Sequence, residues 1–473
     1  MKKNKLALAL TATLGLGAFA GSAQAINLAE NGVGEFNYIP YFSVTKAQDE
    51  YINIVNTSNL TVAAKIVFRR GTDSVEVRDF NIILSPRDVW TGSISAVKDA
   101  SGAVTNAKII TSDNTCTVPS KDKWNKEANG VYSVPFDSAL FGSNVALTSS
   151  NVLPGFQSQM IKDIKEGYVT VVVMGVSDIG TDVVNSVPYL AKHVNGVPRD
   201  CGAIDASFAD AAGFASIKGQ FSQAENVLRV SSLLVDAKNS LAIGVPVTSL
   251  ANAFNSGESA ARTKGINNIQ LSENDLPKEP NVDPLVANVF ESNSATLFTG
   301  TIDKAERTIS AVLMNNSVYG TYDTTSGTKS SWVMTFPTKR ALMTLRPGSV
   351  APFKDSVVPL AKLAWDTEEA AIVSSSNTNF SPFSPATPAT LALPYEVNVL
   401  GFGKQNPLAS TLITDADQKF AAGWMQVGFP DAVAVSGVSG TPTFTGMPVI
   451  GFEYFENGGL SAANSLGFAK FIK

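Results

Sequence analysis

Residues 49–94 restrict the fold of this chain more than any other stretch, because they read as four consecutive β-strands. Apolar residues occupy every second position over residues 60–68, while Lys65 and Arg69 point to the opposite side. This is the period of a strand with one buried face. The alternation changes parity near residues 78–79, where one extra residue in a β-bulge keeps both apolar runs on one face. The pattern predicts an antiparallel β-sandwich.

The low charge of the chain limits its partners. Charged residues make up 16% of the sequence, below the roughly 25% usual in globular domains, and small polar residues replace them. The formal net charge is −5, and no cluster of Lys and Arg is present. Such a chain is a poor candidate for binding nucleic acid or anionic membrane surfaces. The composition favours an extracellular β-rich protein over a cytosolic enzyme.

The first 25 residues have the features of an export signal. Lysines precede an apolar stretch at residues 6–20, and residues 23–25 (AQA) match a cleavage motif. The apolar run is too short and too rich in small residues for an uncleaved membrane anchor. Ile26 follows the motif where a lipid-anchored protein has a cysteine. We therefore expect an exported chain that begins at Ile26, has no membrane-spanning segment, and reaches the cell surface or medium, with the periplasm as the alternative.

The two cysteines of the chain are Cys116 and Cys201. Two unpaired buried thiols and one disulfide are both conceivable, and export to an oxidising compartment favours the disulfide. A loop of 201 − 116 = 85 residues makes such a bridge worth about 4.5 kcal/mol in the chain-entropy model. Neither cysteine has a CxxC partner or a neighbouring histidine, so no metal or redox role is predicted.

The periodicity predicts a mostly β protein of two antiparallel β-sandwich-like (Ig-like) domains with long loops and a few short helices. Residues 256–284 are polar, lack periodicity and contain three prolines, which marks a linker or long loop. The expected organisation is a signal peptide at 1–25, an N-terminal sandwich at 26–255, the linker at 256–284 and a C-terminal β-rich domain at 285–473.

Several further elements follow from the same patterns. Residues 35–44 read as an edge strand, where Pro40 is tolerated, and residues 166–175 read as a central strand apolar on both faces. The remaining expected elements are strands at 103–110, 227–235, 308–314, 331–336, 340–345, 395–402, 421–427 and 448–454, and short helices at 157–164 and 204–212.

A series of segments resembles a family of exported, β-rich proteins of Gram-negative bacteria, known as hypothetical or cell-surface proteins. These segments include NIVNTSNLTVAAKIVFRR, LSPRDVWTG, EGYVTVVVMG, HVNGVPRDCGAI, SSWVMTFPTKR and GMPVIGF. The resemblance covers nearly the whole chain after residue 25, and SSWVMTFPTKR with LSPRDVWTG is its most specific part. It implies export and a β-rich fold. It implies no reaction, cofactor or catalytic residue.

Catalytic and metal motifs are not found in the sequence. His193 is the single histidine, and its surroundings (KHVNG) read as a turn rather than as part of a nucleophile motif. One histidine and two separated cysteines cannot build a zinc site. No phosphate-binding glycine loop or EF-hand is present. We predict no catalytic residue, no cofactor and no metal, and we expect a protein that is not an enzyme.

Carboxylate pairs and tryptophans leave a carbohydrate function open. Glycoside cleavage needs only two acids close in space, and the candidates are residues 368–369 and Glu453 with Glu456. Trp90, Trp124, Trp332, Trp365 and Trp424 could supply sugar platforms. Trp332 and Trp424 lie in apolar strands, where packing in the core is expected. Residues 336–340 (FPTKR) form a basic corner that reads as a structural turn.

These observations favour a non-enzymatic cell-surface or extracellular-matrix protein that acts by structural or adhesive contact. Its expected partners are other surface or matrix chains, including copies of itself joined through the edges of residues 35–44 and 451–472. An exported carbohydrate-binding or carbohydrate-active protein is the first alternative. An outer-membrane β-barrel is the second, and the chain end FAKFIK and the long loops argue against it.

Overall fold

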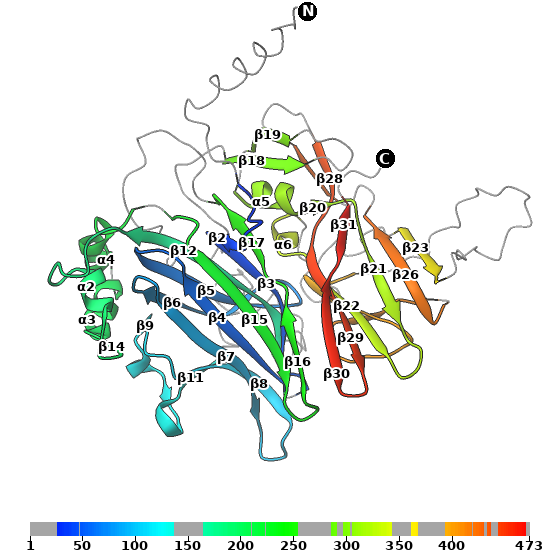
Figure 1. The fold of residues 1–473 in the computed structure, drawn as a ribbon, viewed down its shortest axis with the longest axis horizontal. Helices are drawn as coiled ribbons and strands as arrows, with labels where there is room; N and C mark the ends of the chain where they lie inside the picture. Colours follow the sequence, from blue (N-terminus) through cyan, green and yellow to red (C-terminus); the bar gives the residue numbers. More distant parts are fainter. Residues whose placement is uncertain are drawn as a thin grey trace, which may run out of the picture.

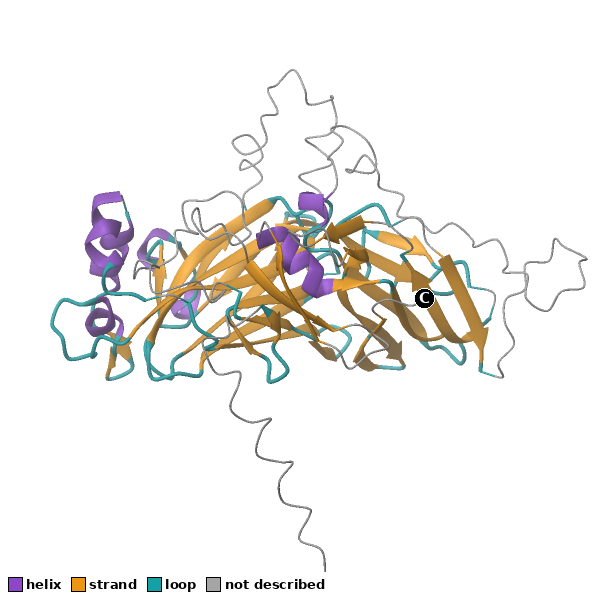
Figure 2. Ribbon diagram, turned by 90° about the horizontal axis from the view of Figure 1, so that it is seen from above, coloured by secondary structure: helices purple, strands orange, loops and turns teal. Residues whose placement is uncertain are grey.

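A computed structural model shows a protein built mostly of antiparallel sheets in two halves (Figure 1). Figure 2 shows the strands of the halves following one another along the molecule, with one group of helices at the end formed by the first half and further helices near the middle. The predicted signal peptide, most of the helix expected at 157–164 and the linker at 256–284 lie outside the described residues. The structure describes residues 26–46, 48–136, 164–209, 211–222, 224–253, 285–290, 297–302, 305–342, 361–367, 393–418, 420–429, 433–436 and 443–469.

The first half is a sandwich of two sheets. The seven-stranded sheet has the order β1 (Asn27–Leu28), β17 (Thr248–Ala251), β3 (Phe36–Ser43), β12 (Glu166–Ser177), β5 (Thr61–Arg70), β6 (Glu76–Leu84) and β9 (Cys116–Val118). The eight-stranded sheet has the path β10 (Asn125–Lys126), β11 (Tyr132–Pro135), β8 (Val104–Thr111), β7 (Val89–Lys98), β4 (Asp49–Asn56), β15 (Leu228–Asp236) and β16 (Leu241–Val245), and β2 (Val33–Gly34) pairs with β15.

The four strands predicted within residues 49–94 are confirmed as β4, β5, β6 and β7. β4 and β7 pair in the eight-stranded sheet, and β5 and β6 pair in the seven-stranded sheet. The predicted bulge is also found, because Phe68 lies opposite Arg78 while Arg69 lies opposite Glu76. Val77 is the extra residue, and it keeps the apolar side chains of β6 facing the core.

The expectation that Lys65 and Arg69 face solvent is wrong. Their exposed fractions are 2% and 4%. The outer face of the sheet is covered near Ala63 and Met174 by apolar residues of a helical cap, formed by α2 (Val187–Ala191), α3 (Cys201–Phe208) and α4 (Ala211–Lys218). Lys65 Nζ lies 2.6 Å from Asp79 Oδ2. A strand covered on both faces can retain an alternating sequence when its buried polar residues find partners.

Residues 35–44 do not form an edge strand. β3 lies between β17 and β12, and all eight of its residues are buried. Its pairing with β12 passes from Phe42–Gly167 to Ile39–Val169, so two residues of β3 oppose one residue of β12. Pro40 is one of those two, and a bulge is where proline is tolerated inside a sheet. The central strand predicted at 166–175 is confirmed, because β12 has twelve residues and all are buried.

The second half contains two facing sheets and smaller pairs. The four-stranded sheet has the order β23 (Ala361–Asp366), β26 (Ala422–Gly428), β21 (Ser317–Asp323) and β31 (Gly467–Ala469). The five-stranded sheet has the order β25 (Ile413–Asp415), β24 (Val397–Gly401), β22 (Lys329–Thr335), β29 (Ile450–Asn457) and β30 (Leu460–Ser465). β20 (Met314–Asn315), β28 (Thr443–Pro448) and β27 (Val433–Ser436) form a third sheet, and β18 (Leu285–Phe290) pairs with β19 (Leu297–Ile302).

Two strands expected in this half are helices. Residues 308–314 fall largely in α5 (Ala305–Leu313), and residues 340–345 begin in α6 (Lys339–Leu342). The error in α5 has a clear origin, since Ile309, Ala311 and Leu313 fit a period of two. The buried pair Ile309 and Val312 fits a helix equally well. Short apolar runs of this kind do not distinguish helix from strand.

The two halves share one apolar core. Val333, Val397 and Phe452 of the second half belong to the same buried cluster as the core of the first sandwich. The rings of Tyr41 and Phe452 lie 6.4 Å apart, and Thr335 Oγ1 donates to Pro40 O at 2.6 Å. Within the described residues the sheets of the two halves share no strand. The halves are therefore separate in topology and joined in packing.

Candidate functional site

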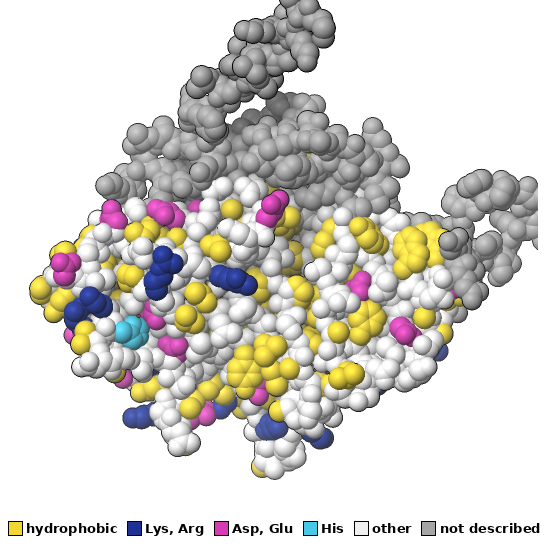
Figure 3. Space-filling view, viewed as in Figure 1, with side chains coloured by type: hydrophobic (Ala, Val, Ile, Leu, Met, Phe, Trp, Pro, Cys, Tyr) yellow, Lys and Arg dark blue, Asp and Glu magenta, His cyan; other side chains and the backbone are white. Residues whose placement is uncertain are grey.

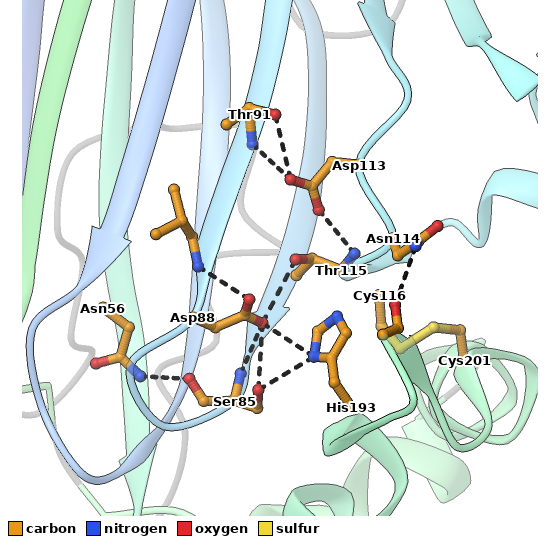
Figure 4. Close-up of polar contacts among 12 residues, drawn as sticks. Asn56, Ser85, Asp88, Thr91, Asp113, Asn114, Thr115, Cys116, His193 and Cys201 are labelled. Atoms are coloured by element: carbon orange, nitrogen blue, oxygen red, sulfur yellow. Dashed lines mark hydrogen bonds and ion pairs between the residues drawn. A yellow bond between two sulfur atoms is a disulfide. The ribbon is translucent and has the colours of Figure 1, made fainter.

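His193 begins a small hairpin of β13 (His193–Val194) and β14 (Val197–Pro198). Asn195 and Gly196 form its turn with positive φ angles of 52° and 81°, as a tight two-residue hairpin turn requires. The side chain of His193 is one-quarter exposed and points toward the β6–β7 turn (Figure 4).

The contacts of His193 differ from those of a catalytic triad. Nδ1 lies 3.3 Å from Ser85 Oγ and 3.7 Å from Asp88 Oδ2. A triad places the serine and the carboxylate on different ring nitrogens, whereas here both approach Nδ1. Ser85 Oγ also lies 3.3 Å from Asp88 Oδ2 and donates to it. These contacts connect the hairpin of His193 to the β6–β7 turn.

Asp88 organises the turn beneath His193. Its carboxylate accepts hydrogen bonds from the backbone N–H of Val89 at 2.9 Å and of Ser85 at 3.2 Å. Burial raises the pKa of Asp88, and the neighbouring His193 acts in the opposite direction. These bonds resemble those of a carboxylate that stabilises a turn.

The predicted disulfide between Cys116 and Cys201 is confirmed. It joins β9, at the edge of the seven-stranded sheet, to the first residue of α3 (Figure 4). Asn114 Nδ2 donates to Gly196 O at 3.0 Å close to the bridge. The helical cap and the His193 hairpin are thus attached to the sandwich at neighbouring points.

Lys339 is the most strongly perturbed cation in the described residues, and it lies in the FPTKR corner. It is fully buried, and Nζ donates to Leu393 O at 2.9 Å and to Tyr395 O at 3.1 Å. Burial lowers its pKa to about 7, against the effect of Glu396. A lysine of this kind is chemically a candidate nucleophile. Here two backbone carbonyl oxygens accept hydrogen bonds from the buried amine. Lys339 therefore connects its own segment to residues 393–395.

The junction between the halves contains further buried polar contacts. Glu166 Oε1 accepts from Tyr41 Oη at 2.7 Å, and Glu166 Oε2 accepts from the backbone N–H of Thr411 at 2.6 Å. Burial raises the pKa of Glu166, and the bonds from Thr411 partly offset this. Tyr168 Oη lies 2.6 Å from Ser74 Oγ and donates to Pro337 O at 3.4 Å. These groups are connected across the junction and serve its structure.

The candidate carboxylates do not face one another as a pair. Glu453 accepts from Thr321 N at 2.9 Å and from Thr321 Oγ1 at 3.1 Å, whereas Glu456 Oε1 lies 2.7 Å from Lys329 Nζ. Burial raises the pKa of Glu453. Each acid has its own partners. Residues 368–369 lie outside the described part of the chain.

The tryptophans divide into core and surface residues. Trp90 and Trp332 are fully buried, and Trp124 is 8% exposed. Trp424 is 40% exposed, so the expectation that it packs in the core is wrong. Its ring stacks on Trp365 with centroids 3.9 Å apart and planes at 11°. Met425 and Val427 supply the buried face of β26, and Trp424 lies on the other face.

Neither a metal-binding cluster nor a membrane-spanning helix occurs among the described residues. In the part of the chain that the structure describes, no group of three His, Cys, Asp or Glu residues is placed to hold a metal ion. No helix among those residues is both long enough and apolar enough to cross a membrane. Comparisons of the chain with protein-family models, curated proteins and solved structures give no match.

Proposed function

We propose that this protein is an exported, non-enzymatic component of the cell surface or extracellular matrix that acts by contact with other chains through strand edges. The observation that carries the proposal is β30, which forms one edge of the five-stranded sheet. Its sequence, LSAANS, has no charged residue and no proline. Natural edge strands are usually guarded by such residues. An unguarded edge offers main-chain groups to a further strand.

Four features support the exported and non-enzymatic parts of the proposal. The first 25 residues carry an export pattern, and the disulfide suits an oxidising compartment. The charged side chains visible in Figure 3 are scattered over a mainly uncharged surface. His193 and Lys339, the residues best suited by type to catalysis, are both held in structural contacts.

Fractionation of cells and medium, followed by sizing of the native material, tests this function. We expect recovery in a high-mass surface fraction. A strictly monomeric periplasmic species that binds a small sugar would contradict the proposal. An activity that His193→Ala abolishes in the folded protein would contradict its non-enzymatic part.

Carbohydrate binding is the second candidate, favoured by the stack of the half-buried Trp365 on the exposed Trp424. Aromatic rings on a sheet face provide apolar area next to polar groups. Tyr319 adds a third ring on the same sheet, is 44% exposed and lies over Gly467. Retention on immobilised neutral polysaccharides checks this candidate. If the protein binds carbohydrate there, Trp424→Ala should no longer be retained on the polysaccharide. Tyr51→Ala, which changes an exposed aromatic residue of the other half, should still be retained.

A further inference from the structure

Two hairpins from different halves lie side by side in the molecule. One is β15–β16 and the other is β29–β30, and their outer strands β16 and β30 run next to each other (Figure 1). Within the described residues, Ser461 Oγ donating to Ala242 O at 3.4 Å is the one hydrogen bond between these two strands. No backbone ladder joins them. Each strand therefore shields an edge of the other without pairing with it.

Neither edge carries its own protection. β16 (LAIGV), like β30 (LSAANS), contains no charged residue and no proline. Ala242, Gly244 and Ala462 are exposed, and a Cβ built on Gly244 would have no heavy atom within 4 Å. Proteins guard exposed edges with charges, prolines or bulges. Strands without such guards depend on their neighbour for cover.

An ionic cluster fastens the turn ends of both hairpins. Lys46 Nζ lies 3.5 Å from Asp236 Oδ2 at the end of β15 and 3.8 Å from Glu456 Oε2 near the end of β29. Lys46 Nζ also donates to Pro407 O at 2.9 Å. The cation thus holds a carboxylate from each half. We call Lys46, Asp236 and Glu456 the latch.

Neighbouring groups keep the latch charged. Burial alone would raise the pKa of Asp236, but hydrogen bonds from Asn239 and the charge of Lys46 outweigh it, and the pKa is lowered. The pKa of Glu456 is likewise lowered, because Lys329 and Lys46 outweigh the effect of burial. Tyr454 Oη donates to Glu456 Oε2 at 3.0 Å, and Lys329 Nζ lies 2.7 Å from Glu456 Oε1, so both are further titratable groups at this place. The carboxylates are therefore ionised at neutral pH and lose charge only below their usual range near pH 4.

We propose that the latch of Lys46, Asp236 and Glu456 holds β16 and β30 against each other, and that its release opens a strand-acceptor site for a second copy of this chain. The partner follows from the chemistry of the edges. Exposed N–H and C=O groups are matched by another extended strand, and the uncharged β30 of a second copy meets no like charge when it pairs antiparallel with β30. The inference rests on the proposed contact function. It adds where the contact forms, which chain binds there, and which ionic cluster regulates access to the site.

Lys46→Met tests the latch, because it removes the cation and retains most of the side-chain volume. We expect amide exchange in β16 and β30 to become roughly tenfold faster, the change expected from losing one charge-assisted contact. Exchange in β12 should stay unchanged. Sizing at neutral pH should show dimers or larger species. Lys238→Met is the matched control, since Lys238 is an exposed lysine in the β15–β16 turn, and it should leave exchange and size as they are.

The double variant Lys46→Met/Ala462→Lys tests the acceptor site, because a charge placed on β30 guards the edge. It should retain fast exchange and lose the additional association that Lys46→Met causes relative to the wild type. Unchanged exchange in folded Lys46→Met overturns the latch. If Lys46→Met exchanges faster but does not associate, a second copy of the chain is not the partner. The role of the latch in holding β16 and β30 together is then still supported. Association that persists in the double variant overturns the acceptor site. A wild-type protein found only as a periplasmic monomer contradicts the proposed function and does not alter the exchange result.

Discussion

Phe80 and Arg69 lie on opposite faces of one sheet, and both are buried. Phe80 packs in an aromatic group with centroid distances of 6.1 Å to Phe68, 5.6 Å to Trp90 and 5.1 Å to Trp124. Arg69 Nη1 donates to Ser74 O at 3.1 Å. The alternation of the sequence identified the two faces correctly. It could not show that the outer face is covered, because the covering residues come from elsewhere in the chain.

Phe80→Ala should lower the free energy of unfolding by about 3–5 kcal/mol, since it leaves a cavity among three rings. From the sequence alone, Arg69→Ala is expected to cost at most about 0.5 kcal/mol. Its burial changes that expectation to about 1–3 kcal/mol, because a buried hydrogen bond is lost. Denaturant melts of both variants check these values. An Arg69→Ala protein as stable as the wild type would show that this side chain is solvated in solution.

Glu50 is a carboxylate in the core of the first sandwich. It points inward from β4, where it is fully buried, and accepts a hydrogen bond from Ser232 Oγ. Within the described residues, Oε2 has no hydrogen-bond partner. Burial raises the pKa of Glu50 from 4.5 to about 8. The group therefore holds a proton at neutral pH in the folded protein and releases it on unfolding.

A raised pKa fixes the sign of the pH dependence. The proton bound by folded Glu50 stabilises the protein fully below pH 4.5, and this contribution is lost as the pH rises toward 8. Glu50→Gln cannot ionise, so it should gain stability over the wild type across this window, by on the order of 5 kcal/mol at most. Melts of both proteins between pH 5 and pH 8.5 measure the difference. Parallel stability curves would place Glu50 in contact with water.

The helical cap is held to the sandwich by apolar packing and by one covalent bond. Phe208, Phe214 and Phe221 belong to the cluster that covers Ala63 and Met174. The bridge between Cys116 and Cys201 ties the first residue of α3 to β9. Since the cap lies at the end of the sheet, its loss need not open the sandwich core.

Replacement of both cysteines by serine should loosen the cap first. The chain-entropy model gives a loss of about 4.5 kcal/mol for a closed loop of 85 residues. We expect faster amide exchange in α3 and α4 with little change in β12. The wild-type protein should show no reactive thiol under denaturing conditions. Two labelled thiols in protein taken from the periplasm or medium would contradict the bridge in the cell.

Elements with a clear local period were predictable, and elements set by distant packing were not. The alternation of β4 to β7 and the apolar run of β12 identified these strands and the bulge between β5 and β6. The interior position of β3 depends on β17, more than 200 residues further along the chain. The helix α5 was missed because its apolar residues satisfy two periods at once.

The junction between the halves shows why the candidate sites were mostly beyond sequence reasoning. Glu166 meets Thr411, and Lys46 meets both Asp236 and Glu456, over separations of about 200 residues or more. Nothing in the local sequence marks these residues as partners. The cysteine pair was predictable because only one pairing of two cysteines exists. The exposed position of Trp424 was not, because a large aromatic residue in a mainly apolar strand is expected to pack in the core.

The shared core predicts that the two halves unfold together. Phe452 and Val333 pack in the same apolar cluster as Tyr41, so separating the halves exposes core residues of both. Calorimetry should therefore show one transition, with equal calorimetric and van't Hoff enthalpies. Far-UV circular dichroism and tryptophan fluorescence should follow the same curve, because tryptophans lie in both halves.

Thr411→Val makes this test specific to the junction. The change removes the Oγ1 hydrogen bond of 2.7 Å to Glu166 and keeps the one from the backbone. A bond to a buried carboxylate is worth about 1.5–3 kcal/mol. In a cooperative molecule this loss lowers the single transition as a whole, and the exposed Thr105→Val leaves it in place. If the halves were independent, Thr411→Val would split the curve or shift only part of it, and the junction would then be a docking contact rather than part of one core.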